Sequence, residues 1–254
     1  MSKLLDKLDK AAQPAPRRMG FVAADASAPV PPLALIVRFD SSTALSIPDA
    51  AQHADSVILT VPQANQAPLP ANLPESTPWG IQASSLNAED LSPLTEQGCD
   101  FFVLNAQASP ASLLNDENTA KVLSVLPSIE EEYLRILEDV PIDCVLIEHG
   151  TREDLKINDL MTLRSILTAV TKPSIVNIRP EMSEGDLRAL RHVGVIGVVV
   201  DVASEEDAAQ LPRLRKEIDA LPPREEDERR QVESLGSHVG HPAAHSLHDD
   251  ELDD

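Results

Sequence analysis

VGVIGVVVDVA, residues 193–203, is the stretch of sequence that decides the fold. It follows a helical pattern that ends at Gly194, it is dominated by β-branched apolar residues, and it stops at an acid, Asp201. A continuous apolar run of this kind is typical of a parallel strand that is buried on both faces. We interpret it as the last strand of a closed barrel, with Asp201 in a polar ring at one barrel mouth.

Seven further apolar runs precede this one, and successive runs start 20 to 31 residues apart. The eight predicted strands cover residues 33–40, 56–61, 79–85, 99–106, 121–126, 142–149, 173–179 and 195–202. Helical patterns fill most of the intervals, which favours right-handed crossovers between parallel strands. A chain of 254 residues is long enough for a barrel domain of about 250 residues. The sequence therefore predicts a (β/α)8 barrel of the α/β class.

Signals for helix ends fall between the predicted strands. Three serines are each followed by an acid at the spacing of a capping box: Ser128 with Glu131, Ser183 with Asp186, and Ser204 with Asp207. Pro110 follows Ser109, as is common in a first helical turn. Gly98 and Gly194 directly precede strands, where a left-handed residue ends a helix favourably. We therefore expect helices to alternate with the strands.

Three regions make up the predicted domain organisation. Residues 1–32 contain an amphipathic helix, in which Leu4 and Leu8 share one face, and a proline-rich linker. This helix docks on the domain, caps the bottom of the barrel or binds a partner, and docking is the commonest of these outcomes. Residues 33–222 form the barrel. Residues 223–254 form an acidic, histidine-containing tail that we expect to be disordered.

Two intervals between strands are longer or less regular than the others. Residues 62–78 contain five prolines, and we expect an irregular segment there in place of a helix. Residues 150–158 (GTREDLKIN) precede a predicted helix over residues 159–170. Both segments follow the C-terminal ends of strands, where barrel enzymes carry their lids.

The charge of the chain restricts its partners. Its formal charge is −21 at pH 7, and its aromatic residues are one Trp, one Tyr and four Phe. Phosphate contacts require clustered Lys and Arg, and base stacking requires aromatic side chains. We therefore expect neither nucleic acid nor a membrane surface as a partner. A protein partner bound through the N-terminal helix or the acidic tail remains compatible with this composition.

The two cysteines and the distribution of apolar residues indicate in which cellular compartment the protein resides. Cys99 and Cys144 lie at or inside apolar runs, which favours buried thiols in a reducing environment over a disulfide. No apolar run approaches the roughly 20 residues needed to span a bilayer. The first residues, MSKLLDKLDK, lack the apolar core of a signal peptide. We expect a cytoplasmic protein.

Polar side chains interrupt the apolar strands near their C-terminal ends. Residues two apart on a strand share a face, so one choice of inward face in each strand gathers these groups at a single barrel mouth. The candidates are Arg38, Asp40, Gln82, Ser84, Asn105, Glu148, Asn177, Arg179 and Asp201. His149 follows Glu148 and would point the other way, as a structural residue.

Two interpretations of this ring remain open. Strand order would place Glu148 beside Arg179, and Asp201 between Arg179 and Arg38. The first interpretation is an internal ion-pair network that closes the barrel, because buried charges must be paired. The second is an anion site, in which Arg38 and Arg179 hold a carboxylate or phosphate while Glu148 or Asp201 acts as acid or base.

The anion-site interpretation also gives roles to three amide side chains and raises the question of a metal ion. Gln82, Asn105 and Asn177 would contact the substrate. Glu148 and Asp201 are also candidate oxygen ligands for Mg²⁺. Two acids without a third spaced ligand are a weak metal signal, so we predict no dedicated metal site.

The sequence lacks the motifs that several kinds of catalysis require. The barrel region has no lysine at the C-terminal end of a strand, which argues against a Schiff-base aldolase. It also has no glycine-rich phosphate loop, no HExxH and no CxxC. The absence of these motifs narrows the possible chemistry and favours a barrel that does not catalyse a reaction.

Two segments share a helix, glycine, strand pattern: LTEQGCDFFVLN (residues 94–105) and LRALRHVGVIGVVVDV (residues 187–202). This pattern resembles the repeating unit of the phosphate-binding and aldolase-like TIM barrels. The resemblance covers roughly residues 33–221 and implies the fold. The glycine-rich turn after strand seven of the phosphate-binding barrels is replaced here by Asn177, Ile178, Arg179 and Pro180, so no catalytic residue is carried over.

The sequence leads to two functional hypotheses. The first is a barrel that binds a small anionic metabolite at its C-terminal mouth, as a lyase or isomerase with Glu148 or Asp201 as acid or base. The second is a non-catalytic barrel that acts as a scaffold or protein-interaction module. The ring of polar strand ends favours the first hypothesis, and the missing motifs favour the second.

Overall fold

The computed structural model describes residues 2–13, 31–40, 51–64, 73–74, 76–149 and 154–222. Most of the predicted linker, most of the proline-rich segment, the start of the 150–158 insertion and the acidic tail lie outside these residues. Among the described residues, no helix is long and apolar enough to cross a membrane.

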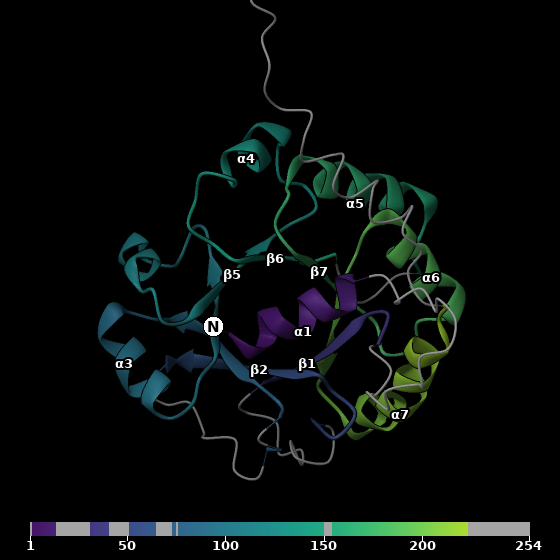
Figure 1. The fold of residues 1–254 in the computed structure, drawn as a ribbon, viewed down its shortest axis with the longest axis horizontal. Coiled ribbons are helices and arrows are strands. Elements are labelled where there is room, and N and C mark those ends of the chain that lie inside the picture. The colour runs from purple at the N-terminus through teal and green to yellow at the C-terminus, as the bar shows by residue number, and fades with distance from the viewer. Residues whose placement is uncertain are drawn as a thin grey trace, which may run out of the picture.

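The eight strands form one closed parallel barrel in chain order, from β1 to β8 (Figure 1). The closure is made by β1, which pairs with both β2 and β8. The predicted (β/α)8 barrel is confirmed. The strands are β1 (Ala34–Asp40), β2 (Ser56–Gln63), β3 (Trp79–Ser85), β4 (Phe101–Asn105), β5 (Ala120–Val125), β6 (Cys144–Ile147), β7 (Ser174–Ile178) and β8 (Gly197–Val202).

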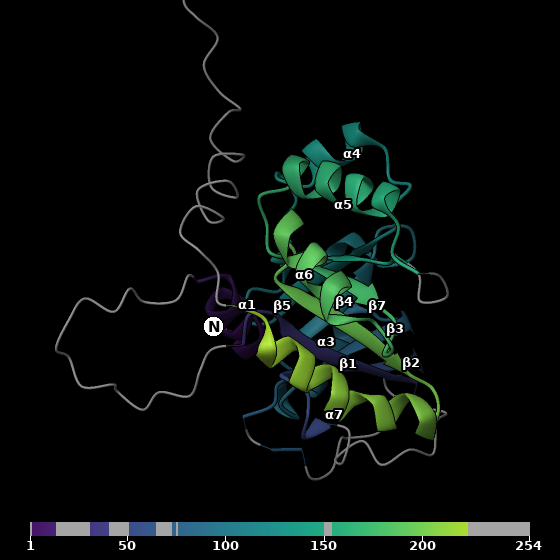
Figure 2. The same cartoon turned by 90° about the vertical axis from the view of Figure 1, so that its right-hand side faces the viewer.

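Helices surround the barrel, as the views along and across its axis show (Figures 1 and 2). The helices outside the strands are α3 (Ala88–Glu96), α4 (Glu131–Ile136), α5 (Ile157–Ala169), α6 (Glu184–Val193) and α7 (Glu205–Ala220), with a short 3-10 helix, η2 (Ala111–Asn115). A ring of helices buries the outward-facing apolar residues of the strands, which explains why these strands are apolar on both faces.

Strand alternation divides the core into two clusters. In β1, Ala34 and Ile36 belong to the cluster inside the barrel, while Leu35, Val37 and Phe39 belong to the cluster between strands and helices. Arg38 continues the inward set at the next alternate position. The inward face of each strand is thus apolar at the bottom and polar at the C-terminal end.

Most predicted helix ends are confirmed. The side chains of Ser183 and Ser204 accept hydrogen bonds from the backbone N–H groups of Asp186 and Asp207. Gly98 and Gly194 have φ angles of 91° and 112°, in the left-handed region that favours glycine.

Two predicted helix starts are wrong. Ser128 does not cap α4, because Glu130 occupies the N-cap position and the helix begins at Glu131. Pro110 is the N-cap of the 3-10 helix η2 and not the first residue of an α-helix. In both cases the spacing was suitable, but the chain turns one or two residues later than the motif predicts.

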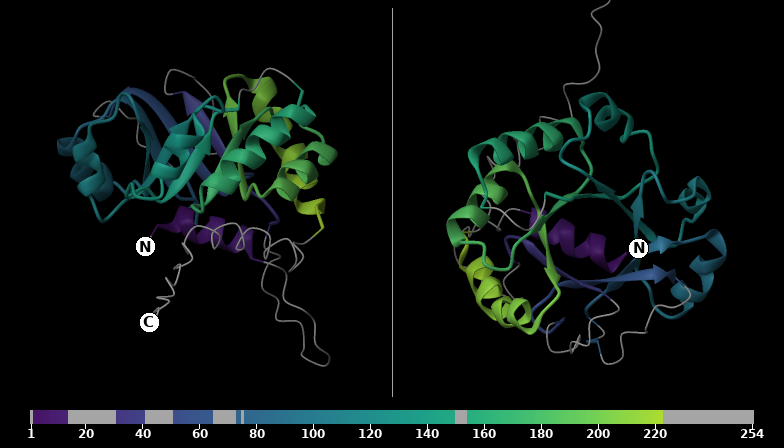
Figure 3. Two further views of the ribbon diagram at one scale, coloured as in Figure 1. Left: turned by 90° about the horizontal axis from the view of Figure 1, so that it is seen from above. Right: turned by 180° about the vertical axis from the view of Figure 1, so that it is seen from behind.

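The N-terminal helix α1 (Lys3–Ala12) lies across the bottom of the barrel (Figure 3). Leu4 and Leu8 are fully buried in the cluster inside the barrel. The carboxylate of Asp100, just before β4, accepts hydrogen bonds of 2.7–2.9 Å from Ser2 Oγ and the backbone N–H groups of Lys3 and Leu4. The helix therefore docks on the domain and caps the barrel bottom, two of the three alternatives that the sequence left open.

Both cysteines are buried as free thiols. Burial raises the pKa of the Cys99 thiol to about 12, and burial likewise raises the pKa of Cys144. Because the neutral form is favoured, these thiols behave as small apolar core residues.

Candidate functional site

The guanidinium of Arg38 lies at the centre of the polar groups in the C-terminal mouth. Its Nε and Nη2 donate to the two carboxylate oxygens of Asp201 at 2.5 and 3.1 Å. Its Nη1 and Nη2 donate to the two oxygens of Glu148 at 2.5 and 3.0 Å. Arg38 thus holds two carboxylates, one from β8 and one from the end of β6, in paired hydrogen bonds.

Three neutral side chains complete this network. Nη1 of Arg38 also donates to Oε1 of Gln82 at 3.1 Å. Ser124 Oγ donates to Glu148 at 3.2 Å, and Nδ2 of Asn177 donates to Asp201 at 3.0 Å. We call these six residues the mouth network: Arg38, Gln82, Ser124, Glu148, Asn177 and Asp201.

Electrostatics favour the charged form of Arg38. Burial alone would lower the pKa of its guanidinium, but hydrogen bonds and charge from Asp201 and Glu148 outweigh burial and raise the pKa. The side chain of Arg38 is 13% exposed, compared with 20% for Glu148 and 38% for Asp201. The cation is therefore less exposed than either of the two carboxylates that it binds.

Arg179 is not part of the mouth network, which corrects the predicted arrangement. Its Nη2 donates to Oδ1 of Asp154 at 2.5 Å, and Asp154 follows β6. The sequence placed Arg179 between Glu148 and Asp201, whereas Arg38 occupies that position. Strand order alone could not distinguish them, because a long arginine side chain reaches across several strands.

Asn105 is also separate from the network. Its side chain is exposed, and its Oδ1 accepts hydrogen bonds from the backbone N–H groups of Gln107 and Ala108 at 2.9 and 3.2 Å. It therefore shapes the turn after β4. Asp40 and Ser84 are exposed at the C-terminal ends of their strands.

His149 points away from the mouth, as predicted. Its Nε2 lies 3.6 Å from Oδ1 of Asp159 in α5. The histidine therefore links the end of β6 to the helix layer and takes no part in the mouth network.

Ser124 is the member of the mouth network that sequence reasoning missed. It lies at an inward position of β5, two residues after Val122, which belongs to the cluster inside the barrel. The alternation rule would have found it, because a serine interrupts an otherwise apolar strand at the position equivalent to Arg38.

The positive charge in the mouth network is the guanidinium of Arg38. Arg38 lies between the carboxylates of Glu148 and Asp201, where Mg²⁺ would have to bind. In the part of the chain that the structure describes, no group of three His, Cys, Asp or Glu side chains could hold a metal ion.

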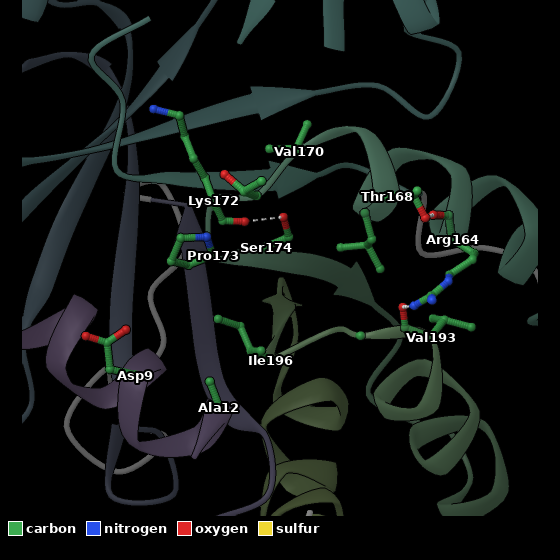
Figure 4. Close-up of a pocket in the computed structure, with 13 residues that line it drawn as sticks. Asp9, Ala12, Arg164, Thr168, Val170, Lys172, Pro173, Ser174, Val193 and Ile196 are labelled. Carbon is green, nitrogen blue, oxygen red and sulfur yellow. Dashed lines mark hydrogen bonds between the residues drawn. The ribbon is translucent and has the colours of Figure 1, made fainter. Parts of the chain in front are cut away.

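A pocket of about 160 Å³ opens at the opposite, N-terminal end of the barrel (Figure 4). Its lining includes Ala12 of α1, Thr168 of α5 and Lys172 before β7. The Lys172 ammonium donates to the backbone oxygens of Val140 and Ile142 at 2.9 Å. This lysine therefore holds the loop before β6, and the pocket contains no reactive group comparable to the mouth network.

Comparisons with known proteins identify the fold. No family model and no curated protein matches the chain. Two mutants of the tryptophan synthase alpha-subunit from Pyrococcus furiosus superpose on it with TM-scores of 0.55 and 0.57, at 16% and 15% identity. Thiamine phosphate pyrophosphorylase from Pyrococcus furiosus superposes with a TM-score of 0.53 at 16% identity.

Each of these three matches covers 73% of this chain and 96% of the other chain. At such identities the similarity concerns the fold and carries no residue roles. The resemblance to TIM barrels that the sequence pattern indicated is confirmed at that level. The chain is a TIM barrel, similar in architecture to these two enzymes.

Proposed function

We propose that the C-terminal mouth binds a small anionic metabolite and that Glu148 or Asp201 transfers a proton during a lyase or isomerase reaction. In this proposal Arg179 holds the anionic group, a carboxylate or phosphate. The mouth network holds the two acids in place. TIM barrels carry their active sites at this end, which supports the choice of mouth over bottom.

The bonding of Arg179 is the observation that carries the proposal. Its guanidinium is bound by Asp154, whose side chain is 87% exposed, and exposed ion pairs contribute little stability. Its Nε is buried and has no hydrogen-bond partner among the described residues. A buried donor without a partner is unfavourable, so a carboxylate or phosphate oxygen at Nε would be stabilised there.

Arg38 has a different role, because its donors are already used. Its Nε, Nη1 and Nη2 all donate to Asp201, Glu148 or Gln82. An incoming anion would have to displace a carboxylate from it. We therefore assign Arg38 to positioning Glu148 and Asp201, and Arg179 to binding.

The acids are suited to proton transfer by their position. Glu148 and Asp201 keep 20% and 38% of their side-chain surface exposed, so each can reach a bound molecule at the mouth. A carboxylate held within hydrogen-bond distance of a substrate proton acts as a general base. Elimination and isomerisation both begin with such a proton removal, and neither requires a lysine Schiff base.

The test is a thermal-shift and calorimetric titration of the full chain with inorganic phosphate, phosphorylated sugars and dicarboxylic acids. Binding to the native state raises the melting temperature. Arg179→Ala should abolish the shift, whereas Arg188→Ala, which removes an exposed arginine of α6, should keep it. No shift with any probe, or equal shifts in both variants, would exclude the anion site.

A second candidate function is a non-catalytic interaction module. The observation in its favour is that the mouth network satisfies Arg38 completely without a ligand, as a structural network would. If a metabolite binds but Glu148→Gln and Asp201→Asn leave every measured turnover unchanged, this second function replaces the first.

A further inference from the structure

The large exposed apolar side chains are concentrated on one side of the barrel. In the described ranges, these are Leu126, Tyr133, Ile136, Ile157 and Met161. Leu126 directly follows β5, and the other four lie in α4 and in the first half of α5. Single exposed apolar residues are ordinary, but a group of them on neighbouring elements marks an interaction surface.

Four of these residues lie on two adjacent helices. Tyr133 and Ile136 of α4 are 60% and 52% exposed, and Ile157 and Met161 of α5 are 78% and 67% exposed. Their spacings of three and four residues place each pair on one helix face. α4 and α5 are neighbours in the helix ring (Figures 1 and 2). We call these four residues the α4–α5 patch.

The fold does not need the patch for its own packing. Leu134 of α4 and Leu163 and Ile166 of α5 are buried and fix these helices on the barrel. Substitutions in the patch are therefore expected to leave the fold intact, which makes the surface open to a direct test.

On its α4 side the patch is bordered by negative charge. Glu130, Glu131 and Glu132 are all exposed at the start of α4. Arg135, the basic residue of that helix, pairs with Glu131 at 2.6 Å. The whole chain carries −21. A partner surface that combines apolar and basic side chains would complement both features.

We propose that the α4–α5 patch binds an amphipathic segment of another protein, in which lysine or arginine residues flank the apolar side chains. A second copy of this chain fits the surface less well. A symmetric dimer through the patch would bring the acidic borders of both copies together, and like charges at an interface are unfavourable.

The probe is a fluorescein-labelled synthetic peptide of leucine and lysine at helical spacing, about 18 residues long, or five turns. Its binding to the full chain is measured by fluorescence anisotropy. A peptide with serine in place of leucine measures binding by charge alone. A peptide with glutamate in place of lysine tests the need for basic residues.

The variant with Ile157→Ser and Met161→Ser should weaken binding of the leucine–lysine peptide by about tenfold or more, as expected when interface side chains are truncated. It should leave the weak binding of the serine–lysine peptide unchanged. The control Ala209→Ser, at an exposed position of α7, should affect neither peptide.

Three results would overturn the proposal. In the first, the double variant and the control bind the leucine–lysine peptide equally. In the second, the leucine–glutamate peptide binds as tightly as the leucine–lysine peptide. In the third, sedimentation shows a dimer of the native chain that the double variant dissociates, which would assign the patch to a second copy. Circular dichroism of each variant verifies that the fold is intact.

Discussion

Arg38 of β1 and Asp201 of β8 are register partners, and the guanidinium of Arg38 donates two hydrogen bonds to the carboxylate of Asp201. β1 and β8 are the first and last strands, so this ion pair lies on the seam where the barrel closes. Glu148, bound to the same guanidinium, extends the link to the C-terminal end of β6. One arginine therefore ties three distant parts of the chain together.

Arg38→Met should destabilise the protein by about 2 kcal/mol or more. Removal of one partner from a buried ion pair leaves an uncompensated charge, although the partial exposure of Asp201 reduces the effect. Urea denaturation measures the change. The triple variant with Glu148→Gln and Asp201→Asn should recover part of the loss, because no like charges then remain. An unchanged midpoint in Arg38→Met would show that the mouth network contributes nothing to stability.

Asp154→Asn should leave the free energy of unfolding within about 0.5 kcal/mol of the native value, since the Asp154 side chain is exposed. It should strengthen the binding of inorganic phosphate or a dicarboxylate, because Arg179 loses its competing carboxylate. Isothermal titration calorimetry checks this second effect. Weaker binding in Asp154→Asn would mean that Asp154 contacts the ligand itself.

Asp100→Asn should reduce stability by about 0.5–2 kcal/mol, the range found for loss of a helix N-cap. The carboxylate of Asp100 satisfies two backbone N–H groups and a hydroxyl at the start of α1. Leu8→Ala should cost more, about 2–5 kcal/mol, because it opens a cavity inside the barrel. Denaturation of both variants, with the exposed Lys10→Ala as control, separates capping from packing.

Gly80→Ala should destabilise the barrel by about 1–3 kcal/mol or more through overpacking. A Cβ at Gly80 would lie 2.5 Å from side-chain and backbone atoms of Phe101 in the adjacent strand β4. Gly185→Ala is the matched control. Its new Cβ approaches Ser183 Oγ at 3.7 Å, and alanine is the better helix former, so stability should not fall. Thermal unfolding of the two variants gives the comparison.

Stability should decrease as the pH rises above 9, the ordinary pKa of a thiol, because both cysteines have raised native-state pKa values. Below that pH both states keep their thiol protons. Above it the unfolded state loses them while the native state retains them, up to about pH 12 for Cys99. The slope is about 1.4 kcal/mol per pH unit for each thiol. Urea titrations at pH 8 to 11 should show this slope developing above pH 9 in the native chain, and a smaller slope in the variant with Cys99→Ala and Cys144→Ala.

The fold could be predicted because its determinants are local and repeated. Each strand is marked by an apolar run such as residues 193–203, and Gly98 and Gly194 mark the turns before β4 and β8 with left-handed φ angles. Alternation along each strand then placed Arg38, Glu148 and Asp201 at one mouth. These features depend on backbone geometry, which neighbouring residues determine.

The pairing within the mouth could not be predicted in the same way. Arg38 and Arg179 both point toward the mouth by alternation, and which of them binds the acids depends on side-chain reach and on the loop that holds Asp154. Ser124 was missed because one small hydroxyl in an apolar strand is a weaker signal than a charged residue, and only the fold shows that it reaches Glu148. Long-range competition between similar side chains is decided by packing in three dimensions.

The helix that closes the barrel bottom places a constraint on how the chain is made. Leu8 of α1 contacts the first residue of β8: a Cβ at Gly197 would lie 3.2 Å from Leu8 Cδ2. These two positions are separated by almost the whole barrel sequence, so the amphipathic helix emerges from the ribosome long before its binding surface exists. Only synthesis of the last strand completes that surface, so the apolar face of the first helix lacks part of its binding partner until then.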